Sequence, residues 1–189
     1  MTSSKLQAAL NLSASIGTVD APASARSAQD DVLRLFDACG PSLFRYVRAL
    51  GIDAATSQDI VQEVFLALFH HVRLERPRHN LKGWLFKVAH NMALKQRRKL
   101  QRRHADEISD IELAELVIDP CLNPEQRLAE EQRHTRLRSV MHALPERDRQ
   151  CLYLRAEGLR YREIADVLGI SLGSVAKSVT RSLARLGNV

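Results

Sequence analysis

The chain has 189 residues and a formal net charge of +6, and 45% of its residues are hydrophobic but only 5% aromatic. This length suits one or two small domains, the composition favours helical bundles over a β-sandwich, and the positive charge suits a polyanionic partner. Cys39, Cys121 and Cys151 are odd in number and form no C-x-x-C pair, which argues against a disulfide framework and fits a reducing cytoplasm.

The sequence lacks the common signatures of catalytic, metal and membrane segments. None of the seven histidines has a Cys or His partner at metal-ligand spacing, and there is neither a glycine-rich phosphate loop nor a G-x-S-x-G motif. No apolar run is long enough to span a membrane, and the N-terminus does not resemble a signal peptide. We therefore expect no enzyme activity, no cofactor or metal and no membrane insertion, and we expect a cytoplasmic protein.

The first half of the chain predicts a flexible leader followed by a helical domain. Residues 1–27 are rich in Ala and Ser with little hydrophobic periodicity, which is typical of a flexible segment. Helical periodicity then occurs over Val32 to Leu50, Ser57 to His71 and Leu81 to about Arg103. Gly40-Pro41 predicts a break or kink in the first of these helices, and Pro77 lies in the polar loop before the third. These helices define a first domain over residues 28–103.

The second predicted helix has an acidic face beside its apolar stripe. The segment DIVQEVFLALF places three polar side chains on one side, namely Asp59, Gln62 and Glu63. Such a face can dock a basic partner helix. The alternative is that it is simply solvated, as most acidic helix faces are.

The third predicted helix, LKGWLFKVAHNMALKQRRKLQRR, combines aromatic residues, an amide and a basic run. Six of the nine residues from Lys95 to Arg103 are Lys or Arg, and binding to phosphate relieves their mutual repulsion. Aromatic rings among cations can stack on exposed bases while the cations hold phosphates. The candidate DNA-contacting residues are Trp84, Lys87, Asn91, Lys95, Arg97, Arg98 and Arg102. Trp84 fits the role of a core anchor equally well.

An acidic linker separates this domain from a second one. Residues 105–126 contain seven acids and no Lys or Arg, and two prolines lie near the end. The abrupt change from basic to acidic sequence indicates separate partners for the two segments. We expect a flexible linker over residues 104–126 and a second helical domain over residues 127–189, with a break at Leu144-Pro145.

The last third of the chain has the pattern of a helix-turn-helix. Ala165 is small where two helices must cross, Gly169 allows the left-handed conformation of a tight turn, and Val175 packs inward from the next helix. Ser171 fits the N-cap of that helix. We therefore expect the second domain to bind DNA.

The final predicted helix, which starts at Leu172, has two faces. Its expected inward stripe consists of Leu172, Val175, Val179, Leu183 and Leu186. The opposite face is basic and rich in hydrogen-bonding groups, with Lys177, Arg181 and Arg185 flanked by Ser174 and Ser178. A recognition helix in a major groove needs such a face. The alternative is a solvated amphipathic helix whose C-terminal cations merely favour the helix dipole.

In their order and spacing, these segments resemble the bacterial RNA polymerase sigma factors of the extracytoplasmic-function (ECF) group. The resemblance covers about Asp30 to Leu186. It rests on DIVQEVF at 59–65, GWLFKVAHNMAL at 83–94, NPEQRL at 123–128, LPERDRQCLYLR at 144–155 and EGLRYREIADVLGISLGSV at 157–175. The chain departs from the common family pattern in its recognition helix, at Ala176 and at Lys177-Ser178, so the family does not predict its promoter sequence.

The resemblance implies an all-α fold of two small helical domains, sigma region 2 and sigma region 4, joined by the acidic linker. It implies that core RNA polymerase binds Asp59, Gln62 and Glu63, and that the third helix opens and holds the −10 element, with Asn91 reading an extruded base. The residues implied to read the −35 element are Arg155, Ser174, Lys177, Ser178, Thr180, Arg181 and Arg185.

The implied partners are core RNA polymerase, promoter DNA and an anti-sigma factor, since anti-sigma factors are common in the group. A helix-turn-helix regulator that acts on duplex DNA without polymerase is the alternative function. It leaves the third helix and the acidic linker unexplained.

Overall fold

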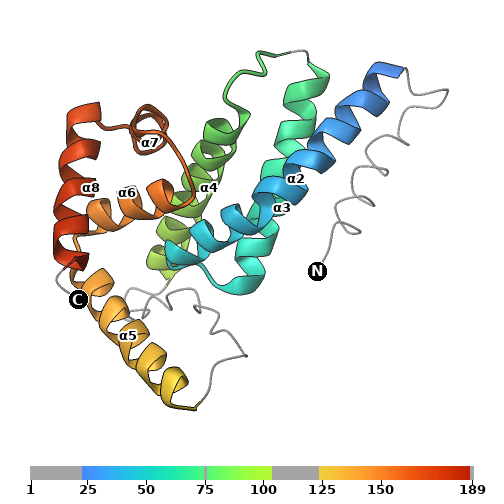
Figure 1. Cartoon of the computed structure of the whole chain (residues 1–189). Coiled ribbons are helices and arrows are strands. Elements are labelled where there is room, and N and C mark those ends of the chain that lie inside the picture. Colours follow the sequence, from blue (N-terminus) through green and yellow to red (C-terminus); the bar gives the residue numbers. More distant parts are fainter. Residues whose placement is uncertain (1–22, 75, 104–123, 188–189) are drawn as a thin grey trace. The chain divides into compact units, whose positions relative to one another are not determined.

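The computed structural model describes residues 23–74, 76–103 and 124–187, which form helices and no strand (Figure 1). The helices are α2 (Ala23–Ala49), α3 (Ala54–Arg73), α4 (Leu81–Arg103), α5 (Pro124–Ala143), α6 (Glu146–Ala156), α7 (Tyr161–Leu168) and α8 (Leu172–Leu186). They divide into two compact units, one built on α2 to α4 and the other on α5 to α8. The all-α fold is confirmed. Within the described ranges, no helix is long and apolar enough to cross a membrane.

Of the break or kink predicted at Gly40-Pro41, the break is wrong, because the helix α2 passes through Pro41 without ending. A proline inside a helix costs about 3 kcal/mol through a lost hydrogen bond and a steric clash. Apolar burial on both sides outweighs this cost, because Val32 before the proline and Leu43 and Val47 after it are completely buried. The helix also begins at Ala23, inside the range predicted as a flexible leader.

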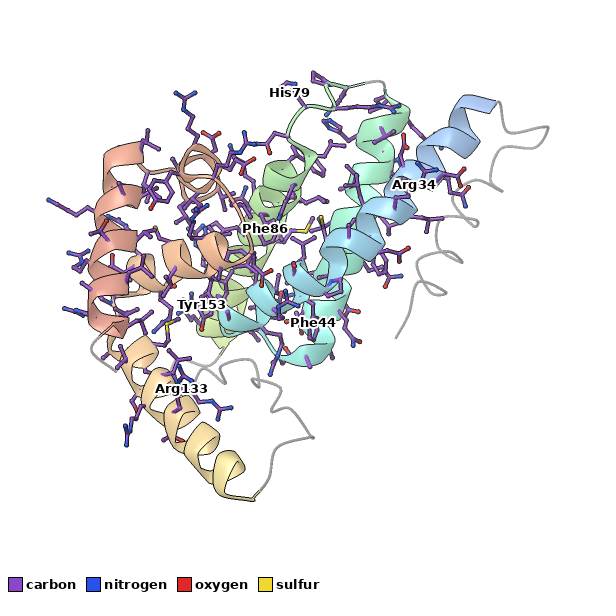
Figure 2. All side chains as sticks on the ribbon, in the orientation of Figure 1. Arg34, Phe44, His79, Phe86, Arg133 and Tyr153 are labelled. Carbon is purple, nitrogen blue, oxygen red and sulfur yellow. The ribbon has the colours of Figure 1, made fainter. Side chains whose placement is uncertain are left out.

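Aromatic contacts hold α2 against α3 and α4 in the first unit. The rings of Phe36 on α2 and Phe65 on α3 meet edge to face at 5.0 Å. Tyr46 on α2 packs against Phe86 of α4 at 5.5 Å, and its hydroxyl lies 2.9 Å from Nδ1 of His90. Phe86 lies inside this bundle, whereas His79 lies at the loop between α3 and α4 (Figure 2). These contacts fix which face of α4 is turned outward.

The second unit contains the helix-turn-helix that the sequence predicts. Gly169 ends α7 in the left-handed conformation, with φ of 64°, and the Ile170 amide donates to the Ala165 carbonyl at 3.1 Å. Ser171 is the N-cap of α8, and its hydroxyl accepts from the Ser174 amide at 3.2 Å. The expected break at Leu144-Pro145 is also confirmed, since it lies between α5 and α6.

The buried face of α8 differs from the predicted stripe. Val175 and Val179 are buried as expected, but Leu172 and Leu183 are 46% and 54% exposed. Their predicted places are taken by Ser178 and Ser182, which are 3% and 0% exposed. Serines fit here because they are small and because the Ser182 hydroxyl donates to the Ser178 carbonyl at 2.8 Å, which satisfies this buried hydroxyl. The helix is therefore rotated about its axis relative to the prediction.

Alanine substitution of two glycines tests the turn. A Cβ at either Gly169 or Gly173 would meet no atom within 4 Å, so only backbone conformation distinguishes the two sites. We expect Gly169→Ala to lower the free energy of unfolding by about 1–2 kcal/mol, because its φ is left-handed. The control Gly173→Ala lies inside α8 and should be neutral or stabilising by up to about 1 kcal/mol.

These free energies are measurable by urea denaturation, followed through the amide signals of α7 and α8. Equal stability of the two variants would contradict the left-handed turn.

Candidate nucleic-acid and polymerase interface

One face of α4 gathers most of the residues predicted to contact DNA. Five of them recur at intervals of three or four residues and are all exposed, and we call them the α4 basic face: Lys87, Asn91, Lys95, Arg98 and Arg102. Four of the five are cations and the fifth carries an amide. Arg97 is half-buried and lies on a different face of α4. This face offers one line of positive charge that is interrupted by a single hydrogen-bonding amide.

Trp84 lies on the same side of α4, at its N-terminal end, and is half-buried. Its ring is 4.9 Å from the ring of His71 on α3. Nε2 of His71 in turn lies 3.0 Å from the carbonyl oxygen of Pro77. His71 therefore connects Trp84 to the loop between α3 and α4, and it is a residue that the sequence analysis did not single out.

The start of α4 is fixed by a contact between Asn80 and Gly83. Asn80 has a left-handed φ of 55°, and its side-chain oxygen accepts from the Gly83 amide at 3.2 Å. A Cβ on Gly83 would lie 2.5 Å from the side-chain nitrogen of Asn80, so any larger residue at this position would displace the Asn80 side chain. The next amide, that of Trp84, donates to the Asn80 carbonyl at 3.1 Å. This cap sets the direction in which α4 leaves the loop.

The same loop is tied to α2 by an ion pair. Nη1 of Arg78 lies 3.1 Å from a carboxylate oxygen of Asp31, and both side chains are about half exposed. Such an exposed pair contributes little stability, at most about 1 kcal/mol. It links the loop to α2 without fixing its path. The two residues are 47 positions apart, and no local sequence signal connects them.

The acidic face predicted on the second helix lies on the outside of α3. Asp59 and Glu63 are exposed and Gln62 is half-buried, while Val64 and Phe65 are completely buried. Asp53 caps the start of α3 by accepting from the Thr56 amide at 2.9 Å, and this backbone hydrogen bond lowers the pKa of its carboxyl. The three polar side chains are therefore available to a partner on a helix with a fixed start.

The predicted −35 residues do not all share one accessible surface. The exposed ones on α8 are Lys177, Thr180, Arg181 and Arg185. Ser178 is 3% exposed, so its prediction as a DNA contact is wrong: its side chain lies in the packing of α8 against the rest of the unit. Ser174 is half-buried, and its hydroxyl lies 2.9 Å from that of Ser171 at the N-cap.

Arg155, on α6, is exposed but engaged within the protein. One of its terminal nitrogens donates to the Leu159 carbonyl at 3.1 Å, and its guanidinium lies 5.5 Å from the centre of the Tyr161 ring. The side chain therefore braces the turn between α6 and α7.

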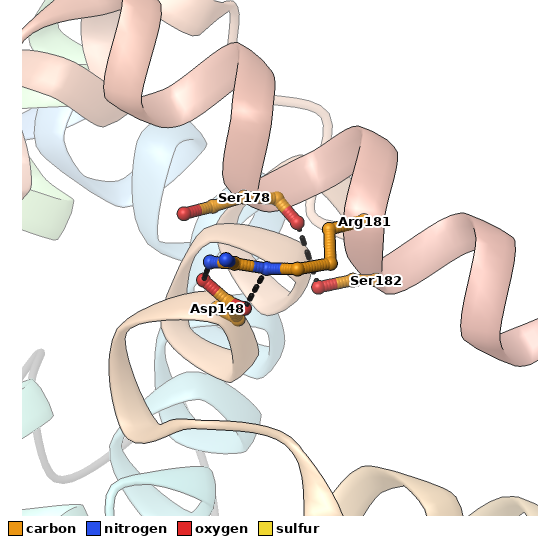
Figure 3. Close-up of polar contacts among 4 residues, drawn as sticks. All are labelled: Asp148, Ser178, Arg181 and Ser182. Carbon is orange, nitrogen blue, oxygen red and sulfur yellow. Dashed lines mark hydrogen bonds and ion pairs between the residues drawn. The ribbon is translucent and has the colours of Figure 1, made fainter.

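Arg181 makes a two-pronged contact with a buried carboxylate that the sequence analysis did not predict (Figure 3). Its Nε and Nη2 donate to the two oxygens of Asp148, each at 2.8 Å. Asp148, in the first turn of α6, is only 1% exposed, while the Arg181 side chain is 49% exposed. The partners are 33 positions apart in the sequence, so helix periodicity gives no sign of the pair.

The pKa shifts of Asp148 and Arg181 both favour the charged form of each side chain. Burial raises the pKa of Asp148, but the hydrogen bonds from Arg181 and Ser178 and the charge of Arg181 outweigh it, so the pKa lies below its ordinary value of 3.8. The hydrogen bond and charge of Asp148 raise the pKa of Arg181. Among the described residues, no group of three His, Cys, Asp or Glu side chains is arranged to hold a metal ion.

Two family models match the chain, one in each unit. The model of Sigma-70 region 2 matches residues 35–103, and that of Sigma-70 region 4 matches residues 134–186. The chain belongs to the bacterial RNA polymerase sigma factors. Its relatives place it in the ECF group, as the resemblance of its motifs predicts.

Three relatives illustrate the range of similarity. The probable RNA polymerase sigma factor RfaY of Xanthomonas campestris pv. campestris is 32% identical over 171 residues, which are 88% of this chain but only 42% of RfaY. The sigma factor CnrH of Cupriavidus metallidurans is 30% identical over 78% of this chain and 80% of its own length. The ECF sigma factor EcfG of Rhodopseudomonas palustris is 27% identical over 85% of this chain and 83% of its length.

The solved structure of CnrH in complex with the cytosolic domain of CnrY resembles this chain with a TM-score of 0.53. The two chains are 25% identical, and the match covers 87% of this chain and 92% of CnrH.

The Asp148 carboxylate predicts a pH dependence of stability. Because its folded-state pKa lies below the unfolded value, it stabilises the second unit above about pH 4, and this stabilisation is lost as the pH falls through the folded-state pKa. We therefore expect Asp148→Asn to be less stable than wild type at about pH 5, and the difference to shrink towards about pH 3.

Urea midpoints from the amide signals of α6 and α8 measure this difference. A gap of the same size at both pH values would show that the charge of Asp148 does not stabilise the fold.

Proposed function

We propose that this sigma factor binds core RNA polymerase through the acidic face of α3 and contacts promoter DNA through α4 and α8. In this proposal residues 28–103 bind the polymerase and the −10 element, and residues 127–189 bind the −35 element. Residues 104–126 link the two domains. The observation that most supports it is the α4 basic face, which sets Asn91 among four cations on one exposed side of a helix. The chain acts by binding polymerase and promoter DNA and catalyses no reaction of its own. It does so in the cytoplasm.

The α4 face suits a strand that has been separated from its partner. Lys87, Lys95, Arg98 and Arg102 attract the phosphates, while the Asn91 amide can donate to and accept from the edge of a base. Unstacking a base costs a few kcal/mol, which stacking on an aromatic ring, at about 1–3 kcal/mol per base, can offset. Trp84 is the aromatic ring at the end of this face. Its half-buried position leaves part of the ring for such a contact.

The α8 helix suits duplex DNA. Lys177, Arg181 and Arg185 are exposed at four-residue intervals, with Thr180 exposed beside them. A helix held by a tight turn and presenting cations can enter the major groove. The sigma factor thus reads two separated parts of a promoter with two different kinds of contact.

We also propose regulation by an anti-sigma protein. The related CnrH was solved in complex with the cytosolic domain of CnrY, and it covers most of this chain at 25% identity. A partner of that kind, bound to this chain, would compete with polymerase or promoter DNA.

The overall proposal is tested by reconstitution. The purified chain is added to core RNA polymerase, promoter sequences are selected from a randomised duplex library, and run-off transcription is measured on the selected promoter. We expect stable association and transcription that depends on the selected sequence. Duplex binding without any polymerase association would instead identify a free-standing regulator.

The acidic face of α3 is tested by a double substitution. Asp59→Ala with Glu63→Ala should weaken binding to core polymerase by about ten-fold, since charged contacts at interfaces contribute about 1–3 kcal/mol. Gln58→Ala, which removes a neighbouring exposed side chain on α3, is the matched control and should bind like wild type. Fluorescence anisotropy of the labelled chain measures both affinities. Unchanged binding by the folded double variant would exclude this face as the polymerase contact.

The base contact on α4 is tested at Asn91. Asn91→Ala should reduce open-complex formation by about ten-fold or more, because an amide-to-base contact contributes about 1–3 kcal/mol. Polymerase binding should not change. Gln101→Ala removes another exposed amide further along α4 and should have little effect. Permanganate reactivity of the −10 thymines reports opening, and equal reactivity of the Asn91 variant and wild type would refute the assignment.

A further inference from the structure

The contact between Asp148 and Arg181 joins a buried group to an exposed one. The carboxylate lies inside the second unit, at 1% exposure, whereas about half of the Arg181 side chain is open to solvent on the same helix as Lys177 and Arg185. α6 packs along α8, which brings the two side chains together (Figure 3). One end of the pair is thus fixed by the fold, and the other faces the surface assigned to DNA.

The geometry restricts the guanidinium strongly. Two parallel hydrogen bonds of 2.8 Å define both the position and the plane of the group, which a single bond would not do. Asp148 is buried at a fixed place on α6, and losing Arg181 would leave its charge buried without a partner, which is costly. The pair is therefore expected to stay formed. Arg181 therefore holds one orientation before any DNA arrives.

The contact leaves part of the guanidinium available. An arginine has five N–H donors, of which the pair with Asp148 uses one on Nε and one on Nη2. The remaining three belong to the terminal nitrogens of a side chain that is 49% exposed. Acceptor oxygens of duplex DNA can therefore bind Arg181 while Asp148 continues to hold it. A side chain that is already restricted also loses less conformational entropy on binding.

We propose that Asp148 is a positioning residue for promoter recognition, which orients Arg181 so that its remaining N–H groups contact an acceptor oxygen of the −35 duplex. This inference rests on the proposed function of α8. Asp148 touches no DNA and acts only through Arg181. The opposite expectation, that Asp148 merely neutralises Arg181 and keeps it from DNA, predicts the reverse effect of removing the carboxylate.

A double-mutant cycle separates these two roles. Holoenzyme is assembled with wild type, Asp148→Asn, Arg181→Ala or the double variant, and its affinity for a selected −35 duplex is measured. Asp148→Asn and Arg181→Ala should each weaken binding by about five- to ten-fold, and the double variant should bind no more weakly than Arg181→Ala alone. Unchanged or tighter binding by Asp148→Asn overturns the proposal. So does a further loss when Asp148→Asn is added to Arg181→Ala, since that loss would reflect general damage to the unit.

The same variants identify the acceptor. If Arg181 contacts a phosphate, Arg181→Ala should lower the slope of log affinity against log salt by about one and weaken all sequences alike. If it contacts a base edge, the loss should be confined to one base pair, at which sequence preference relaxes.

A second measurement stands even if Asp148→Asn does not fold. In the full-length wild type, the Nε–H of Arg181 should exchange slowly with water, because it is bonded to Asp148, and its NMR signal should persist when the selected duplex is added. Loss of the signal on binding would show that Arg181 leaves Asp148 to reach DNA, which overturns the proposal.

Lys177→Ala separates failure of this inference from failure of the proposed function. Lys177 is exposed one turn before Arg181. If Lys177→Ala weakens duplex binding and Asp148→Asn does not, only the positioning role is wrong. If neither Lys177→Ala nor Arg181→Ala changes duplex affinity, α8 does not read the duplex, and the proposed function and this inference both fail.

Discussion

The close packing of α8 within its unit determines which side chains of this helix remain on the surface. Val175 and Val179 supply apolar burial, and Ser178 and Ser182 are small enough to lie in the same buried stripe. Because the buried serines lie towards the basic side of the helix, Ser178 is removed from the surface and Leu172 and Leu183 are exposed instead. The cations at four-residue intervals remain outside, and one of them meets the buried carboxylate of Asp148. The exposed basic surface of α8 and its contact with Asp148 thus both follow from how this one helix is rotated.

Features governed by local physics could be predicted from the sequence. Gly169 is the left-handed residue of the turn and Ser171 is the N-cap, because each is determined by the backbone within a few residues. The side of α4 with Lys87, Asn91 and Lys95 follows from helix periodicity alone. The order of such motifs along the chain was sufficient to indicate the family.

Features governed by tertiary packing could not be predicted in this way. Hydrophobic periodicity places Leu183 in the inward stripe of α8, yet Ser182 is the buried residue and Leu183 is 54% exposed, because burial depends on how the helix packs against its neighbours. Gly40-Pro41 predicts a break or kink, yet the helix continues through Pro41, with Val32 and Val47 buried on either side. The contact of Asp148 with Arg181 joins residues far apart in the sequence, and a single chain carries no signal of such a pair. Those parts of the candidate site that depend on long-range contacts could therefore be identified only from the structure.

The cap at the start of α4 makes the identities of two residues depend on each other. The Asn80 side chain occupies the space that any Cβ on Gly83 would need. A larger residue at position 83 would displace this side chain and remove its hydrogen bond to the backbone amide of residue 83. A smaller side chain at position 80 would leave room for a Cβ at position 83. Two uncharged residues thus fix the direction in which α4 leaves the loop, and with it the placement of Trp84 and of the cations that follow.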